Sequence, residues 1–128
     1  MLNRRDGFTL IEIMVVILIM ALLLAIAIPN FLRARETSRA RSCQGNLRMI
    51  ASAKEQWAMD NRKTGTDTPV AADLVTAYIK GASGVMPTCP GGGTYTIGNM
   101  VTWPACSIGT NSTPADVTDD HIYLERGG

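Results

Sequence analysis

The chain has 128 residues, and its 12 Lys and Arg against 11 Asp and Glu leave a formal net charge of +1. This length suits one domain, and the balanced charge gives no support for a nucleic-acid or acidic-substrate partner. Apolar residues make up 46% of the chain but aromatic residues only 5%. Such an aliphatic excess is typical of a membrane segment. The three cysteines exclude a disulfide-dense miniprotein, and the lone His121 and scattered carboxylates offer no metal or catalytic cluster.

The N-terminal part combines a short polar leader with a long apolar run. Residues 1–7 read MLNRRDG, and in residues 8–28 the apolar run is broken only by Thr9 and Glu12. A helix over this run reaches about 31 Å, which is enough to cross the hydrocarbon core of a bilayer. Pro29 ends the run and predicts a kink or a loosened turn.

The junction at residues 4–12, RRDGFTLIE, closely resembles the cleavage and methylation signal of type IV prepilins and type II secretion pseudopilins. The resemblance implies that a membrane peptidase cuts between Gly7 and Phe8, which leaves 121 of the 128 residues. It also implies that the new N-terminal amine, on Phe8, is methylated. Glu12 then becomes the fifth mature residue, where the family carries a glutamate used in filament assembly.

Glu12 has a physical cost of its own. A carboxylate inside a membrane-spanning helix costs about 2.5–3.5 kcal/mol or more unless it finds a partner. A neighbouring subunit's Phe8 amine could supply that partner and set the axial stagger between subunits. The alternative is a glutamate that sits near the lipid headgroups or is protonated.

Two observations complicate the N-terminal interpretation. Ala25-Ile26-Ala27 resembles the cleavage site of a secretory signal peptide, but the apolar run is longer than the usual signal and contains Glu12. Positive charges also follow the run in residues 33–41, so counting them does not favour a cytoplasmic N-terminus. The family resemblance does favour that orientation, because its peptidase acts on the cytoplasmic face.

From residue 30 to about residue 62 the pattern predicts an amphipathic helix with one narrow apolar face, interrupted by Lys54. The helix should stop near Asn61–Gly65. A second helix is predicted for residues 70–79, with Thr68 as N-cap, Pro69 at the first position and Gly81 as C-terminal cap. The predicted apolar face consists of Ala40, Cys43, Leu47, Ile50 and Trp57.

Beyond Gly81 the sequence predicts short strands. Residues 95–97 and 100–103 should form a hairpin around Gly98-Asn99, a turn signal. Residues 106–108 and 121–124 are weaker strand candidates, and residues 109–120 are polar and loop-like.

Residues 89–95, CPGGGTY, resemble a CP-x-GG-x-Y element of short bacterial pilin-like proteins, which carry a second cysteine shortly afterwards. Cys89 and Cys106 bracket the predicted hairpin, and translocation would bring them into an oxidising compartment, so a disulfide between them is favoured. It would contribute about 3 kcal/mol by chain entropy. Two buried thiols are the alternative, and Cys43, expected as a small core residue, remains a rival partner.

The remaining features carry less information. The arginine-rich stretch 33–48 could touch DNA, but a solvated face, lipid headgroups or an acidic neighbouring subunit explain it as well. Asp116, Asp119 and Asp120 match no calcium loop, and the Asn111 sequon is a weak signal. No nucleophile–base pair or phosphate-binding loop is visible, so neither enzyme activity nor a cofactor is expected.

Together these observations predict an α+β pilin-like fold in which a small helix and an antiparallel β-meander pack on the C-terminal half of a long helix. The expected parts are a leader (1–7), a transmembrane and filament-core helix (8–29) and a head domain (30–128). The expected function is that of a structural filament subunit, in a type IV pilus or, alternatively, a type II secretion pseudopilus. Expected partners are copies of itself, sibling pilins, the prepilin peptidase and the bacterial inner membrane. A membrane-anchored binding module that never polymerises is the alternative from another class.

Overall fold

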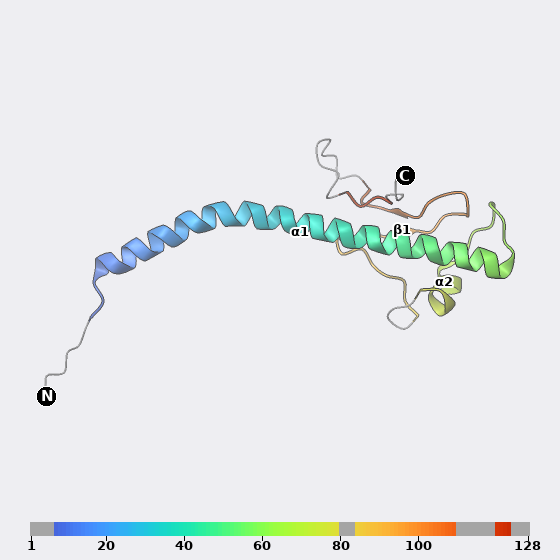
Figure 1. The fold of residues 1–128 in the computed structure, drawn as a ribbon, viewed down its shortest axis with the longest axis horizontal. Coiled ribbons are helices and arrows are strands. Elements are labelled where there is room, and N and C mark those ends of the chain that lie inside the picture. The colour runs from blue at the N-terminus through green and yellow to red at the C-terminus, as the bar shows by residue number, and fades with distance from the viewer. Residues whose placement is uncertain (1–6, 80–83, 110–119, 124–128) are drawn as a thin grey trace, which may run out of the picture. The chain divides into compact units, whose positions relative to one another are not determined.

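The computed structural model describes residues 7–79, 84–109 and 120–123 (Figure 1). These residues form a long helix, α1 (Leu10–Asn61), a short helix, α2 (Ala71–Ala77), and two strands, β1 (Tyr95–Thr96) and β2 (Ala105–Cys106). The strands pair antiparallel, so the predicted α+β fold is confirmed. The chain divides into two compact units, residues 1–35 and 36–128. Several predicted features lie outside the described residues. They are leader residues 1–6, the cap at Gly81, the loop 110–119 with the sequon and two of the three aspartates, and Leu124.

The first unit holds the apolar part of α1. Each large apolar side chain from Leu10 to Leu32 is at least 47% exposed. The helix is long and apolar enough to cross a membrane. It continues through Pro29 without interruption, and the kink expected there stays a prediction. So much exposed aliphatic surface requires an apolar environment outside the chain, either lipid or other helices.

The second unit is built on the remainder of α1, whose apolar face is buried as predicted. Ala40, Cys43, Leu47 and Ile50 are fully buried, whereas Trp57 is half-buried. One core cluster joins Cys43 and Leu47 to Cys89 and Cys106, with Tyr95, Ile108 and Tyr123 packed against it. A second cluster joins Ile50 and Ala53 to Leu74 of α2 and to Ile79. The periodicity of three and four residues therefore identified the packed face correctly.

Helix ends were predicted with mixed success. The end of α1 at Asn61 is confirmed, and Arg62 follows in the left-handed conformation with φ 52°. The short helix exists, but its N-cap is Val70 and not Thr68, so Pro69 precedes the helix. The reason is Asp73, whose carboxylate accepts a hydrogen bond from the Val70 N–H at 3.2 Å and closes the first turn there.

The predicted hairpin around Gly98-Asn99 is wrong. Tyr95 and Thr96 pair with Cys106 and Ala105, and the segment between the strands forms a longer loop. Within it the Asn99 side chain accepts hydrogen bonds from the N–H groups of Val101 and Thr102 at 3.1 and 3.0 Å, which is a local turn that competes with strand pairing. Of the weaker strand candidates, residues 106–108 overlap β2, and His121 forms an isolated bridge with Gly109.

Candidate functional site

The predicted cleavage junction is accessible. Phe8 is 84% exposed, and a side chain at Gly7 would meet no other atom within 4 Å. Both residues precede the first turn of α1. A peptidase could therefore bind this segment in an extended form without unfolding the helix.

Glu12 closes the N-terminus of α1 together with Thr9. The Thr9 N–H and hydroxyl donate to Oε2 of Glu12 at 3.0 and 2.9 Å, and the Glu12 N–H donates to the Thr9 hydroxyl at 3.4 Å. This reciprocal arrangement is a capping box, and the carboxylate also lies at the positive end of the helix dipole. This role was not predicted from the sequence, although Thr-x-x-Glu before an apolar run is its signature.

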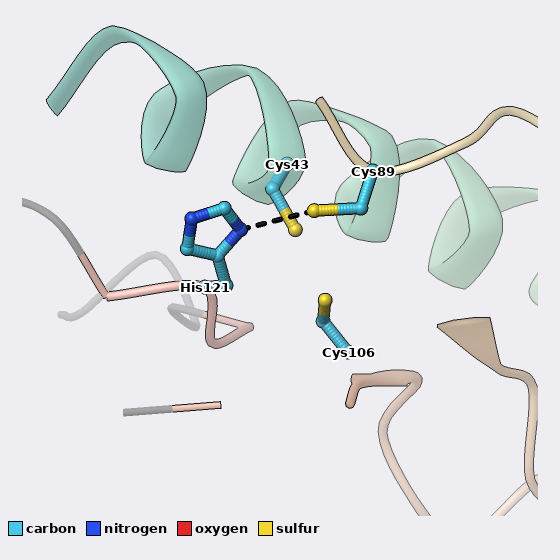
Figure 2. Close-up of side chains that lie close together, drawn as sticks. All are labelled: Cys43, Cys89, Cys106 and His121. Carbon is cyan, nitrogen blue, oxygen red and sulfur yellow. Dashed lines mark hydrogen bonds between the residues drawn. The ribbon is translucent and has the colours of Figure 1, made fainter. Parts of the chain in front are cut away.

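The cysteines and the histidine form one buried group. Cys43 comes from α1, Cys89 from the segment after α2, Cys106 from β2 and His121 from the bridge with Gly109 (Figure 2). One donor atom from each residue lies within 4.8 Å of those of the other three. The Nδ1 atom of His121 is 3.1 Å from the Cys89 sulfur. This cluster was not predicted from the sequence, in which His121 and the cysteines lie far apart.

All three cysteines are free thiols, so the structure does not confirm the predicted disulfide between Cys89 and Cys106. Burial raises the pKa of the Cys43 thiol to about 12. Burial also acts to raise the pKa of Cys89, but the N–H groups of Gly91 and Gly93 and contacts with Cys43 and His121 outweigh it and lower that pKa to about 7. The Cys43 and Cys89 thiols thus differ in environment although they are neighbours.

Two glycines of the CPGGG segment, Gly91 and Gly93, leave no room for a side chain beside this group. A Cβ on Gly91 would lie 2.7 Å from Cε1 of His121, and a Cβ on Gly93 would lie 2.7 Å from the Cys106 sulfur. The Gly92 N–H donates to the Cys89 carbonyl at 2.9 Å, which turns the backbone around the sulfur. The glycines therefore allow the backbone to enclose the cysteine and histidine side chains closely.

Lys54 is a further buried polar residue of the second unit. It is only 3% exposed, and its ammonium donates to the carbonyls of Ile97, Asn99 and Thr102 at 2.8, 2.7 and 2.7 Å. All three ammonium protons are thereby used, although burial lowers the pKa of this lysine. The prediction that Lys54 interrupts the apolar face is therefore wrong. Lys54 lies on the packed face and binds the loop between the strands to α1.

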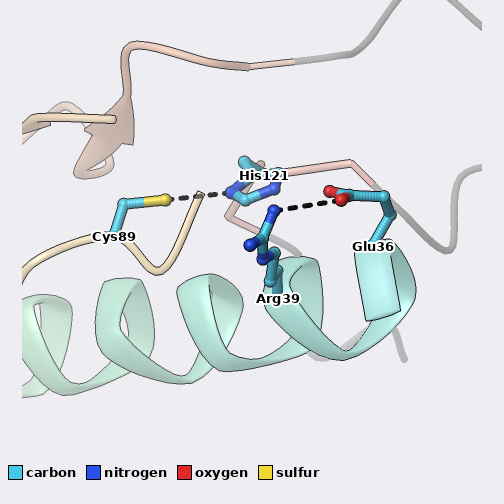
Figure 3. A network of polar contacts seen from close by, with 4 residues as sticks. All are labelled: Glu36, Arg39, Cys89 and His121. Carbon is cyan, nitrogen blue, oxygen red and sulfur yellow. Dashed lines mark hydrogen bonds and ion pairs between the residues drawn. The ribbon is translucent and has the colours of Figure 1, made fainter. Parts of the chain in front are cut away.

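The arginine-rich stretch is solvated in part and ion-paired in part. Arg39 donates to Oε1 of Glu36 at 3.0 Å one helical turn away, and Figure 3 draws this pair with the Cys89–His121 pair. Both side chains are substantially exposed, so the ion pair contributes about 0–1 kcal/mol. Such surface pairing supports the expectation of an ordinary solvated helix face.

Comparison with known proteins gives a consistent set of relatives. Residues 2–28 match the model of the prokaryotic N-terminal methylation motif. The competence protein ComGC of Bacillus subtilis is 32% identical over 90 residues, which cover 70% of this chain and 85% of that protein. Type II secretion system core protein G of Pseudomonas aeruginosa is 34% identical over 46% of this chain, and the type IV major pilin protein PilA of Myxococcus xanthus is 41% identical over 42%.

The alignments differ in how much of each relative they include. The chain covers 42% of the secretion protein and 24% of the Myxococcus pilin, so those similarities concern part of each relative. No solved structure shows a significant match.

Proposed function

Because this chain belongs to the family of type IV pilins and pseudopilins, we propose that it is a structural subunit of a pilus-like filament. The observation that carries the proposal is the first part of α1, an exposed aliphatic helix whose one carboxylate, Glu12, is held at its start. A membrane anchor and a filament core both need such a helix. The second unit, residues 36–128, covers most of the expected head domain (30–128) and is called the head from here on; it forms the exposed part of the subunit.

Processing follows from the accessible junction. We expect a prepilin peptidase to cut between Gly7 and Phe8 and the Phe8 amine to be methylated. Before assembly the subunit spans the bacterial inner membrane with its N-terminus in the cytoplasm. It then enters a periplasmic or cell-surface filament.

Assembly exchanges lipid around the helix for other helices. Because lipid tails are as apolar as the helix, this exchange gains little hydrophobic free energy, and packing, polar pairing and a cellular motor must drive it. The Glu12 carboxylate accepts a hydrogen bond from the Thr9 N–H, and Thr9 directly follows Phe8, whose amine cleavage would create. A neighbour's amine can therefore replace the Thr9 donors, which exchanges an internal cap for a contact between subunits.

The partners in this account are further copies of the chain and sibling pilins. A pseudopilus of type II secretion is the second candidate, favoured by the similarity to core protein G. DNA is not favoured as a partner, because the net charge of the chain is only +1. A membrane-anchored module that never polymerises remains the rival from a different class.

Glu12→Val tests the proposal in a host that carries the full assembly machinery. Membrane insertion and cleavage should persist, because the change removes a costly group and lies five residues beyond the cut. Filaments should be lost, because an unpaired buried amine costs about 3–5 kcal/mol at every contact. Electron microscopy of sheared material and a membrane-fraction blot read the two outcomes.

A matched control is Glu55→Val, which makes the same change at an exposed position of α1 in the head. It should leave filaments intact. Normal filaments from Glu12→Val would refute the pairing mechanism. Their absence from the unaltered chain, with all machinery present, would favour the anchored module.

A further inference from the structure

The strongest unexplained feature of the head is its group of three sulfurs and one imidazole. Cys43, Cys89, Cys106 and His121 are at most 7% exposed, and they come from four separate segments of the second unit. The filament function proposed above uses none of them. Within the described residues, four potential metal donors thus meet at one buried point (Figure 2).

We propose that these four residues form a structural zinc site. A tetrahedral Zn²⁺ site with Zn–S bonds of about 2.3 Å and a Zn–N bond of about 2.05 Å places sulfurs about 3.8 Å apart and the nitrogen about 3.6 Å from each sulfur. The donor atoms here lie within 4.8 Å of one another, with 3.1 Å between Cys89 and Nδ1 of His121. Rotamer adjustments of about 1 Å or less would complete the tetrahedron.

The donor set and its closure specify the kind of site. Three thiolates and one imidazole are typical of structural zinc, whereas catalytic zinc keeps an open position for water. All four donors are protein side chains and all are buried, which leaves no position for a substrate. Zinc also has no redox chemistry of its own, so this site stabilises the fold and does not catalyse a reaction.

The surroundings are shaped for a metal-bound sulfur. The Gly92 N–H donates to the Cys89 carbonyl at 2.9 Å, so the backbone turns tightly around the Cys89 sulfur. Glycine at positions 91 and 93 also lets the backbone approach His121 and Cys106 where a Cβ would collide. On binding, the three thiols release three protons and His121 donates the lone pair of neutral Nδ1.

A disulfide accounts for less of this arrangement. It would use two of the three sulfurs and leave the third thiol and the imidazole buried beside it without a function. Zinc uses all four groups and links α1 to the segments around residues 89, 106 and 121. The head needs such a link, because its strands have two residues each and small cores are often stabilised by metals or disulfides.

Metal content of the full-length chain tests the proposal. The chain is purified in detergent under reducing conditions, loaded with Zn²⁺ or Co²⁺ and freed of excess metal. We expect one zinc per chain by mass spectrometry of the metal and, with cobalt, the absorption bands of tetrahedral thiolate coordination. The bound metal should also protect the cysteines from alkylation until a chelator is added.

Variants separate ligation from packing. Cys43→Ser, Cys106→Ser and His121→Ala should lose stoichiometric metal, whereas His121→Cys should retain it because a fourth thiolate replaces the imidazole. Ser42→Ala, at the exposed neighbour of Cys43, is the matched control and should bind like the unaltered chain. The retained metal of His121→Cys keeps the test decisive even if the other variants fold poorly.

Two results would overturn the proposal. One is an unaltered chain that takes up no metal after reductive loading, or that binds it equally well without His121 and Cys43. The other is a natively extracted chain with a Cys89–Cys106 disulfide and no zinc. Because the measurement uses detergent-solubilised subunits, it is independent of whether they assemble into filaments.

Discussion

Replacing Lys54 by methionine tests how the loop between β1 and β2 is held. Methionine keeps most of the side-chain volume, so the change removes the ammonium without leaving a large cavity. Three carbonyls, those of Ile97, Asn99 and Thr102, then lose their donor. The lysine is 3% exposed, so the position of the ammonium is nearly closed to solvent.

The expected magnitude follows from these contacts. A hydrogen bond to a charged group contributes about 1.5–3 kcal/mol, but three bonds that share one ammonium are not additive. The carbonyls belong to half-buried or exposed residues and recover part of their hydration. We therefore expect a loss of about 3 kcal/mol in the free energy of unfolding of the head, which at an m-value of about 1.5 kcal/mol/M lowers the urea midpoint by about 2 M.

Tryptophan fluorescence of the full-length chain in detergent can follow this transition, because both tryptophans, Trp57 and Trp103, lie in the head. Trp103 stacks on Tyr123 with ring centroids 4.5 Å apart and reports directly on the loop. The control is Lys63→Met, the same substitution at an exposed lysine whose ammonium lies 5.9 Å from the centre of the Trp57 ring, and it should shift stability by less than about 1 kcal/mol. Equal midpoints for the two variants would refute the anchoring role of Lys54.

Three other predictions concern the junction, the first turn of α1 and the cysteine turn. Gly7→Glu should block cleavage, because a charged side chain would crowd the scissile peptide, and full-length protein should accumulate on a membrane-fraction blot; normal trimming would count against the assigned cut. Thr9→Val should weaken the capping box by about 1 kcal/mol, which makes amide hydrogen exchange in the first turn of α1 about five-fold faster. Unchanged exchange rates would contradict the capping role of Thr9. Gly93→Ala should destabilise the head by about 1–3 kcal/mol, because the new methyl group would lie 2.7 Å from the Cys106 sulfur. Urea unfolding measures this loss, and an unchanged midpoint would contradict the packing.

The N-terminal half was predictable because its information is local. An apolar run of sufficient length specifies a helix, and spacings of three and four residues place Cys43, Leu47 and Ile50 on one face. Even here the capping role of Glu12 was missed. The four-residue pattern Thr-x-x-Glu that it forms with Thr9 is local and is visible in the sequence.

The head was less predictable because its contacts join residues far apart in the sequence. Cys43 and His121 are separated by 78 positions, and no spacing rule predicts that they meet. Lys54 broke an apolar pattern, yet it lies on the packed face because three loop carbonyls enclose it. The Gly98-Asn99 turn signal predicted a hairpin, but the Asn99 side chain organises a wider loop.

The most direct test of the account is the mass of the subunit recovered from sheared filaments. The account predicts a chain that begins at Phe8, carries one added methyl group and contains 121 of the 128 residues. A chain that begins at Ile28 would mean that an ordinary signal peptidase removed the apolar helix, and the filament model would then be wrong.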